Sequence, residues 1–73
     1  MELREIEARI GRRVRTVRRA RKLPMSHIAD ALGITYQQMQ KYETGANRIS
    51  AGRLVLIACI LKIPPGDLLP GIE

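Results

Sequence analysis

Side chains that could support catalysis or bind a metal ion are scarce in this sequence of 73 residues. His27 is the only histidine and Cys59 is the only cysteine, so a metal site or a nucleophile paired with a base would lack its second member. A single cysteine also forms no disulfide framework, which indicates a reducing compartment. We therefore expect a protein that is not an enzyme, has no metal site, needs no cofactor and acts by binding a partner.

The positive charge indicates the class of that partner. The formal net charge is +6, and residues 1–22 account for all of it, with nine basic side chains against three acidic ones. Four of the basic residues, Arg12, Arg15, Arg19 and Lys22, recur at helical spacing on one face. A polyanion fits this pattern, although a solvated helix face is the alternative interpretation of the stripe. Within it we expect phosphate contact mainly from Lys22, and long-range attraction from all four.

The hydropathy of the chain disfavours a membrane partner. The longest apolar run, residues 54–61, has eight residues, far fewer than the about 20 that span a bilayer. The first 22 residues are charged throughout and show no signal pattern. We expect a cytoplasmic protein that does not bind a membrane.

The hydrophobic periodicity predicts a single all-α domain over residues 1–73. Leu3, Ile6, Ile10 and Val14 follow each other at steps of three and four, which is typical of a long amphipathic helix. Gly33, Gly45 and the prolines after residue 63 mark the ends of later helices. The expected elements are a helix over 3–22, two helices within 25–44, a helix over 51–62 capped by Ser50, and a short C-terminal turn over 65–69 that counts as the fifth helix.

The segment 25–44 has the spacing of a helix-turn-helix unit. Ala29 is small where two helices would cross, and Gly33 four residues later supplies the positive φ of a tight turn. Met39 and Tyr42 then pack the second helix of the unit back against the first. Because any two packed helices can imitate this spacing, the pattern alone is only moderately specific.

Four short motifs extend the pattern from residue 10 to about residue 69. They are Ile10-Gly11-Arg12-Arg13-Val14-Arg15 with Arg18, Ile28-Ala29 with Leu32-Gly33-Ile34, Tyr42-Glu43 with Gly45, and Leu54 with Ile57-Ala58 and Leu61. In these residues the chain resembles the XRE/Cro-type, lambda-repressor-like helix-turn-helix family of bacterial and phage regulators. The resemblance implies a compact five-helix DNA-binding domain whose third helix enters the major groove of double-stranded DNA.

By this resemblance, the first, second and sixth residues of the third helix read base edges. These positions hold Tyr36, Gln37 and Lys41. Glutamine can bond to adenine through two hydrogen bonds, lysine can reach guanine O6 and N7, and tyrosine can contact a phosphate or a thymine methyl group. A good bidentate contact discriminates between bases by about 1–3 kcal/mol.

A second group of polar side chains is expected on the phosphate backbone. The resemblance places the loop after the third helix along that backbone, with Arg48 as the strongest candidate and Arg53 as a weaker one. Gln38 has a competing role, because it can complete a capping box with the N-cap Thr35. The full set comprises Lys22, Ser26, His27, Thr35, Gln38, Asn47, Arg48 and Ser50.

The start of the second helix departs from the family pattern. The family usually places Ser, Thr or Asn at its N-cap and then a Gln that contacts phosphate, whereas this chain has Pro24 and Met25. Proline offers no capping side chain, and a methionine thioether donates no hydrogen bond to phosphate. Ser26 or His27 could compensate near the free N–H groups of the helix, although a solvated surface side chain is an equal interpretation of His27.

The resemblance also assigns a structural role to two charged residues. In the family, an arginine of the first helix pairs with a glutamate at the end of the third, and these positions hold Arg18 and Glu43. We therefore expect a structural ion pair and leave Arg18 outside the DNA site.

The fourth helix is apolar on every side, which predicts a second buried surface. A monomer would bury only one stripe of such a helix, so we expect a two-fold homodimer on a palindromic operator. The expected interface residues are Val55, Leu56, Cys59, Ile60, Leu68 and Leu69, which Ile72 could extend. Cys59 is then interpreted as a small buried hydrophobic residue.

The sequence therefore favours a transcriptional regulator, more specifically a repressor, in the bacterial or phage-infected cytoplasm and associated with the nucleoid. A regulatory protein partner could control it. The alternative is a protein-interaction module, such as an antitoxin or phage accessory protein with the same fold. The polar side chains on the third helix favour the first interpretation.

Overall fold

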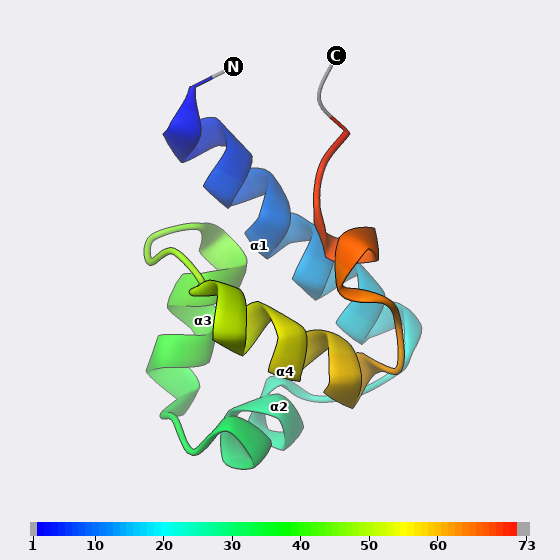
Figure 1. Cartoon of the computed structure of the whole chain (residues 1–73). Coiled ribbons are helices and arrows are strands. Elements are labelled where there is room, and N and C mark those ends of the chain that lie inside the picture. Colours follow the sequence, from blue (N-terminus) through cyan, green and yellow to red (C-terminus); the bar gives the residue numbers. More distant parts are fainter. Residues whose placement is uncertain (1, 72–73) are drawn as a thin grey trace.

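The computed structural model of this protein describes residues 2–71, which form four α-helices and one 3-10 helix (Figure 1). In chain order these are α1 (Leu3–Ala20), α2 (Met25–Leu32), α3 (Tyr36–Thr44), α4 (Ala51–Leu61) and η1 (Pro65–Leu68). The prediction of an all-α fold is confirmed, because the described residues contain no strand. The prediction of five α-helices is wrong, since the fifth element is a single 3-10 turn that begins with a proline.

The helix α1 is the support on which the other elements pack. It contacts α3, α4 and η1, while α2 lies against α3 and α4. Figure 1 shows that the N-terminal turns of α1 project beyond the rest of the domain. The exposure of Leu3 (63%) follows from this position, although Leu3 belongs to the apolar stripe predicted for the core. Among the described residues, no helix is both long and apolar enough to cross a bilayer.

Two helices end earlier than predicted, each next to a lysine in the left-handed region. The helix α1 stops at Ala20, and Lys22 has a φ of 58°. The helix α4 stops at Leu61, and Lys62 has a φ of 60°. In both cases the next amide turns back, from Leu23 to the Arg18 carbonyl and from Ile63 to the Ala58 carbonyl. A lysine gives no sequence signal for this conformation, which glycine usually adopts.

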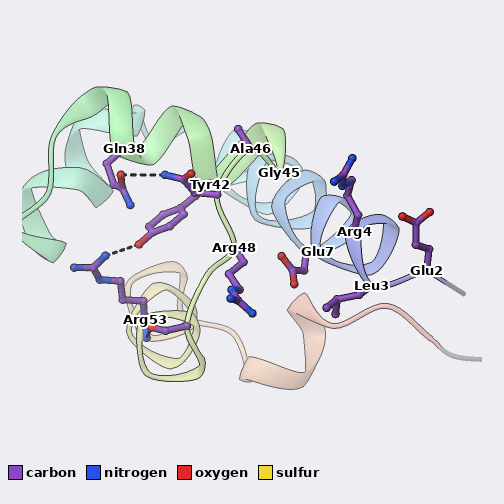
Figure 2. A pocket seen from close by; sticks show the side chains of 12 residues that line it. Glu2, Leu3, Arg4, Glu7, Gln38, Tyr42, Gly45, Ala46, Arg48 and Arg53 are labelled. Atoms are coloured by element: carbon purple, nitrogen blue, oxygen red, sulfur yellow. Dashed lines mark hydrogen bonds between the residues drawn. The ribbon is translucent and has the colours of Figure 1, made fainter.

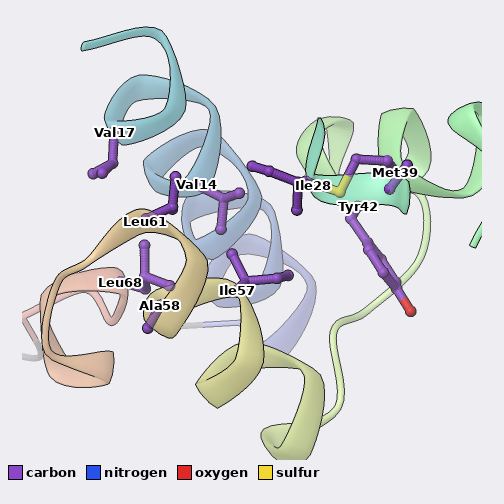
Figure 3. Packing of buried hydrophobic residues seen from close by; sticks show 10 residues of the cluster. Val14, Val17, Ile28, Met39, Tyr42, Ile57, Ala58, Leu61 and Leu68 are labelled. Carbon is purple, nitrogen blue, oxygen red and sulfur yellow. The ribbon is translucent and has the colours of Figure 1, made fainter. Parts of the chain in front are cut away.

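Every element contributes to one hydrophobic core (Figure 3). Its buried members are Val14, Val17, Ile28, Ala29, Met39, Tyr42, Ile57, Ala58, Leu61 and Leu68. The prediction that Leu68 belongs to a dimer interface is therefore wrong. Leu68 is completely buried, because η1 packs against both α1 and α4 and turns this side chain inward. The suggested extension at Ile72 lies outside the described residues.

The backbones of α1 and α3 approach each other closely at Gly11. A Cβ atom at this position would lie 2.2 Å from the carbonyl oxygen of Tyr42 and 3.1 Å from that of Glu43. A second close approach follows at Gly45, which ends α3 with a φ of 82° and whose Cβ would lie 2.9 Å from the Cα of Ala8. Two glycines therefore allow the last turn of α3 to lie directly on α1.

We predict that Gly11→Ala strongly destabilises the domain. The new methyl group would meet a backbone oxygen rather than a flexible side chain, so α1 and α3 must separate, at a cost of about 3 kcal/mol. Thermal unfolding followed by circular dichroism should show a midpoint about 12 °C lower or more.

Gly52→Ala is the matched control for this substitution. Gly52 lies in α4, and a Cβ there would meet no atom within 4 Å. The control should raise stability by about 0.5–1 kcal/mol, because alanine favours the helix. Equal midpoints for the two variants would contradict the proposed close contact.

Candidate nucleic-acid interface

The exposed face of α3 carries polar side chains with no internal partner. Tyr36, Gln37 and Lys41 are all exposed, Tyr36 to 51%, and among residues 2–71 none of their side chains forms a hydrogen bond or ion pair within the chain. The opposite face of the helix is buried through Met39, Tyr42 and Glu43. The three predicted base-reading residues are thus placed together on one free surface.

The two ends of α3 are fixed by local interactions. At its start, the hydroxyl oxygen of Thr35 accepts a hydrogen bond from the backbone amide of Gln38 at 3.1 Å. This N-cap satisfies one of the free amides of the first turn. At its end, Gly45 takes the left-handed conformation and its amide donates to the Tyr42 carbonyl.

A buried ion pair connects α1 to the last turn of α3. The Nε of Arg18 donates to Oε2 of Glu43 at 2.6 Å, and Nη2 of Arg18 donates to Oε1 at 3.0 Å. The remaining Nη1 of Arg18 donates to the Leu23 carbonyl at 2.8 Å, at the start of the connection to α2. Both residues are buried, with exposures of 8% and 4%. Arg18 is thus used inside the protein, and is not available to DNA as a free cation.

The side chain of Gln38 binds the loop after α3 and does not complete the predicted capping box. Its Oε1 accepts a hydrogen bond from Nδ2 of Asn47 at 3.2 Å. The expected return bond from Gln38 to the Thr35 amide is not among the hydrogen bonds of the described residues. Gln38 and Asn47 therefore hold the loop against α3, and each retains part of its hydrogen-bonding capacity for a ligand.

A contact between α3 and α4 was missing from the sequence predictions. The Nη1 of Arg53 donates to the phenolic oxygen of Tyr42, and the guanidinium lies 6.0 Å from the centre of the ring (Figure 2). Tyr42 was expected only as an apolar residue of α3, and Arg53 only as a weak phosphate candidate. The signal that could have located the bond is that a buried tyrosine hydroxyl needs a polar partner.

The loop between α3 and α4 forms one wall of an open groove. Arg48 is exposed and projects into the space between this loop and the N-terminal part of α1 (Figure 2). Ser50 also lines the groove, but its hydroxyl oxygen accepts a hydrogen bond from the Arg53 amide and so caps α4. Of the loop residues, Arg48 is the one with a free charge to offer to a phosphate.

The remaining phosphate candidates lie around the start of α2. Ser26 and His27 are exposed in its first turn, and Lys22 is exposed in the preceding connection. Pro24 occupies the N-cap position and makes no side-chain cap bond. The predicted departure from the family pattern is thus visible as an uncapped start of α2.

A small cleft of about 120 Å³ lies between α1 and α3, close to this start of α2. Arg15 and Arg19 line it from α1, and Gln40 and Thr44 line it from α3. Gln40 and Thr44 were not among the predicted site residues. Helical spacing could have identified them, because they follow Tyr36 at steps of four and so share its face.

The predicted dimer residues on α4 are for the most part on the surface. Val55 is 52% exposed, Leu56 is 55% exposed, and Cys59 is also exposed. Leu69, which directly follows η1, is 51% exposed. Ile60 is half-buried and packs against the core, so it could offer only an edge to a second subunit.

Comparison with known proteins finds similarity over most of the chain. A family model described as helix-turn-helix matches residues 14–68. An uncharacterized HTH-type transcriptional regulator of Sinorhizobium fredii, y4wC, is 42% identical over 60 residues, which cover 82% of this chain and 42% of that protein. An uncharacterized transcriptional regulator in the ATPase CF(0) region of Rhodospirillum rubrum is 48% identical over 59 residues, which cover 81% and 55%. The chain thus spans about half the length of the relatives that it matches.

Solved structures share the fold. The restriction-modification controller protein C.AhdI from Aeromonas hydrophila aligns with a TM-score of 0.79 at 26% identity, over 85% of this chain and 94% of that one. The DNA-binding domain of BldD aligns with a TM-score of 0.81 at 22% identity, over 96% and 100%. The second similarity is one of fold alone.

We predict that Glu43→Ala destabilises the domain by about 3–5 kcal/mol, because it leaves the buried guanidinium of Arg18 without its counter-ion. The free energy of unfolding should be measured by urea denaturation. Replacing both partners, as Arg18→Met with Glu43→Leu, should recover part of the loss, since no buried charge remains.

The control is Glu5→Ala, which removes the exposed ion pair between Glu5 and Arg9. Surface pairs of this kind contribute at most about 1 kcal/mol. If Glu43→Ala were no more damaging than this control, the buried pair would have no structural role.

Proposed function

The chain belongs to the XRE-type helix-turn-helix family of transcriptional regulators, and from this membership we propose that it is a sequence-specific repressor that binds a palindromic DNA operator as a homodimer. In this proposal α3 lies in the major groove of double-stranded DNA. The observation that carries it is the free polar face of α3, held in one orientation by the buried pair between Arg18 and Glu43.

The side chains on that face have the chemistry of base recognition. Gln37 can bond to the N6 and N7 atoms of adenine, and Lys41 can reach O6 and N7 of guanine. Tyr36 offers a hydroxyl and an apolar ring to a phosphate or a thymine methyl group. Because these side chains have no partner within the described part of the chain, binding DNA would break no internal hydrogen bond.

Backbone contacts would come from the loop after α3. Arg48 provides the free charge, while Asn47 and Gln38 already support each other and can donate further hydrogen bonds. Thr35 and Ser50 would contribute less, because their hydroxyl oxygens are already engaged in capping. Ser26, His27 and Lys22 lie around the start of α2, where the helix dipole also favours an anion.

The dimer would form through the exposed apolar side of α4. Val55, Leu56 and Cys59 share that side, and Leu69 adds to the apolar surface of a segment that packs on α4. A two-fold dimer places its two recognition helices about 34–36 Å apart, or a multiple of this, which matches half-sites on one side of a duplex. Occupying such an operator in the bacterial nucleoid would block transcription without any enzymatic activity. Control would then rest on protein concentration or on a regulatory protein partner.

The proposal predicts that selection from random duplex DNA enriches a palindromic sequence. On that operator, Lys41→Ala should relax the preference at one base pair per half-site, with a loss of about 1–3 kcal/mol in discrimination. Arg48→Ala should instead weaken binding to all sequences alike and reduce the salt slope by about 1. Fluorescence anisotropy with operator variants separates the two effects, and the absence of any enriched palindrome would contradict sequence-specific binding by a dimer.

The dimer is tested by Leu56→Asp. A charge in the centre of the proposed interface should convert the protein from a dimer to a monomer in sedimentation equilibrium at tens of micromolar, with little change in folding, because Leu56 is 55% exposed in the single chain. Leu3→Asp is the control, since Leu3 is 63% exposed on α1 and should leave the dimer intact. A wild-type protein that sediments as a monomer would overturn this part of the proposal.

A further inference from the structure

The cleft between α1 and α3 carries a positive charge that the fold leaves uncompensated. Arg15 and Arg19 form no ion pair within residues 2–71. They are one helical turn apart on α1, where like charges repel each other and disfavour the helix. Glu43 is the acidic residue that lines the cleft, and its two carboxylate oxygens are both bonded to Arg18. The cleft is therefore a place where an anion would relieve a repulsion.

The cleft opens at the edge of the face proposed to read DNA. Tyr36, Gln40 and Thr44 follow each other at steps of four along α3, so the cleft residues Gln40 and Thr44 continue the stripe that begins at Tyr36. The opposite edge of α3 is bordered by the loop that carries Arg48. A major groove about 12 Å wide has a phosphate strand on each side, so a duplex that receives α3 brings one strand to each of these edges.

The start of α2 gives this edge few other hydrogen-bond donors. Pro24 has no N–H group, and the side chain of Met25, which also lines the cleft, cannot donate to a phosphate. The guanidinium groups of Arg15 and Arg19 carry planar pairs of N–H donors that match phosphate oxygens. Gln40 adds an exposed amide from the other wall.

We propose that Arg15 and Arg19 bind a backbone phosphate of double-stranded DNA in the cleft between α1 and α3, on the side of the major groove opposite to Arg48. This inference rests on the proposed insertion of α3 into the groove. It assigns to α1 a direct contact with DNA, in addition to a general attraction.

The test compares two charge-matched double variants of the full chain. Arg15→Gln with Arg19→Gln removes the cleft cations. Arg13→Gln with Arg21→Gln removes the same charge from the side of α1 where these arginines donate to the carbonyls of Asp67 and Lys62. Binding to a labelled duplex of arbitrary sequence, and to the selected operator, is followed by anisotropy between 50 and 200 mM salt, after circular dichroism has shown that both variants are folded.

We expect the cleft variant to reduce the slope of log K against log salt by about 0.9 for each phosphate that the protein no longer neutralises, on both duplexes, with unchanged base preference. The control should lower affinity less and keep the wild-type slope, because it removes only long-range attraction. Arg15→Lys with Arg19→Lys should keep the slope, since lysine retains the charge.

Two results would overturn the inference in distinguishable ways. If the cleft variant and the control weaken binding equally and with equal slopes, the cleft holds no phosphate, while DNA binding by α3 stands. If the wild-type protein binds neither duplex at 50 mM salt, the proposed function and the cleft contact fall together.

Discussion

The buried ion pair between Arg18 and Glu43 is the constraint on which the arrangement of this domain depends. Removing two charges from water costs several kcal/mol per ion, and this cost is offset only when every donor and acceptor meets its partner with good geometry. Here the guanidinium bonds to both carboxylate oxygens and to the Leu23 carbonyl. A rotation or sliding of α3 along α1 would leave one charge buried and unpaired. The pair therefore fixes α3 relative to α1, and with it the direction in which the polar face of α3 points.

This pairing is possible only because the two backbones come close together. Gly11 lets the carbonyl end of α3 lie on α1, and Gly45 lets the chain leave α3 over Ala8. The same turn of α3 carries Tyr42, whose hydroxyl accepts a hydrogen bond from Arg53 at the start of α4. One small region thus connects α1, α3 and α4 by contact, charge and hydrogen bond. The core around it is almost entirely aliphatic, so these directional contacts supply the specificity that packing alone would not.

The sequence predicted those features that neighbouring residues encode. The N-caps Thr35 and Ser50 and the terminating glycines Gly33 and Gly45 stand where the structure has them, because each acts within one helical turn. The errors concern long-range contacts. Leu68 is buried because a four-residue turn folds back over α1 and α4, which no periodicity of so short a segment can show. Gln38 turns toward Asn47 because the loop lies beside it, and the capping pattern contains no information on that loop.

The net charge of +6 is divided among different tasks once the side chains are placed. On α1, Arg18 is neutralised by Glu43, Arg9 is paired with Glu5, and Arg13 and Arg21 donate to carbonyls of the C-terminal segment. Arg15 and Arg19 have no such partner among the described residues. The exposed face of α3 has only Lys41 as a charged member. In the proposed complex, salt-dependent affinity and base discrimination therefore reside on different elements. Substitutions on the face of α3 can then change which sequence is preferred without altering the charges that hold the protein to DNA or the pair that holds α3 in place.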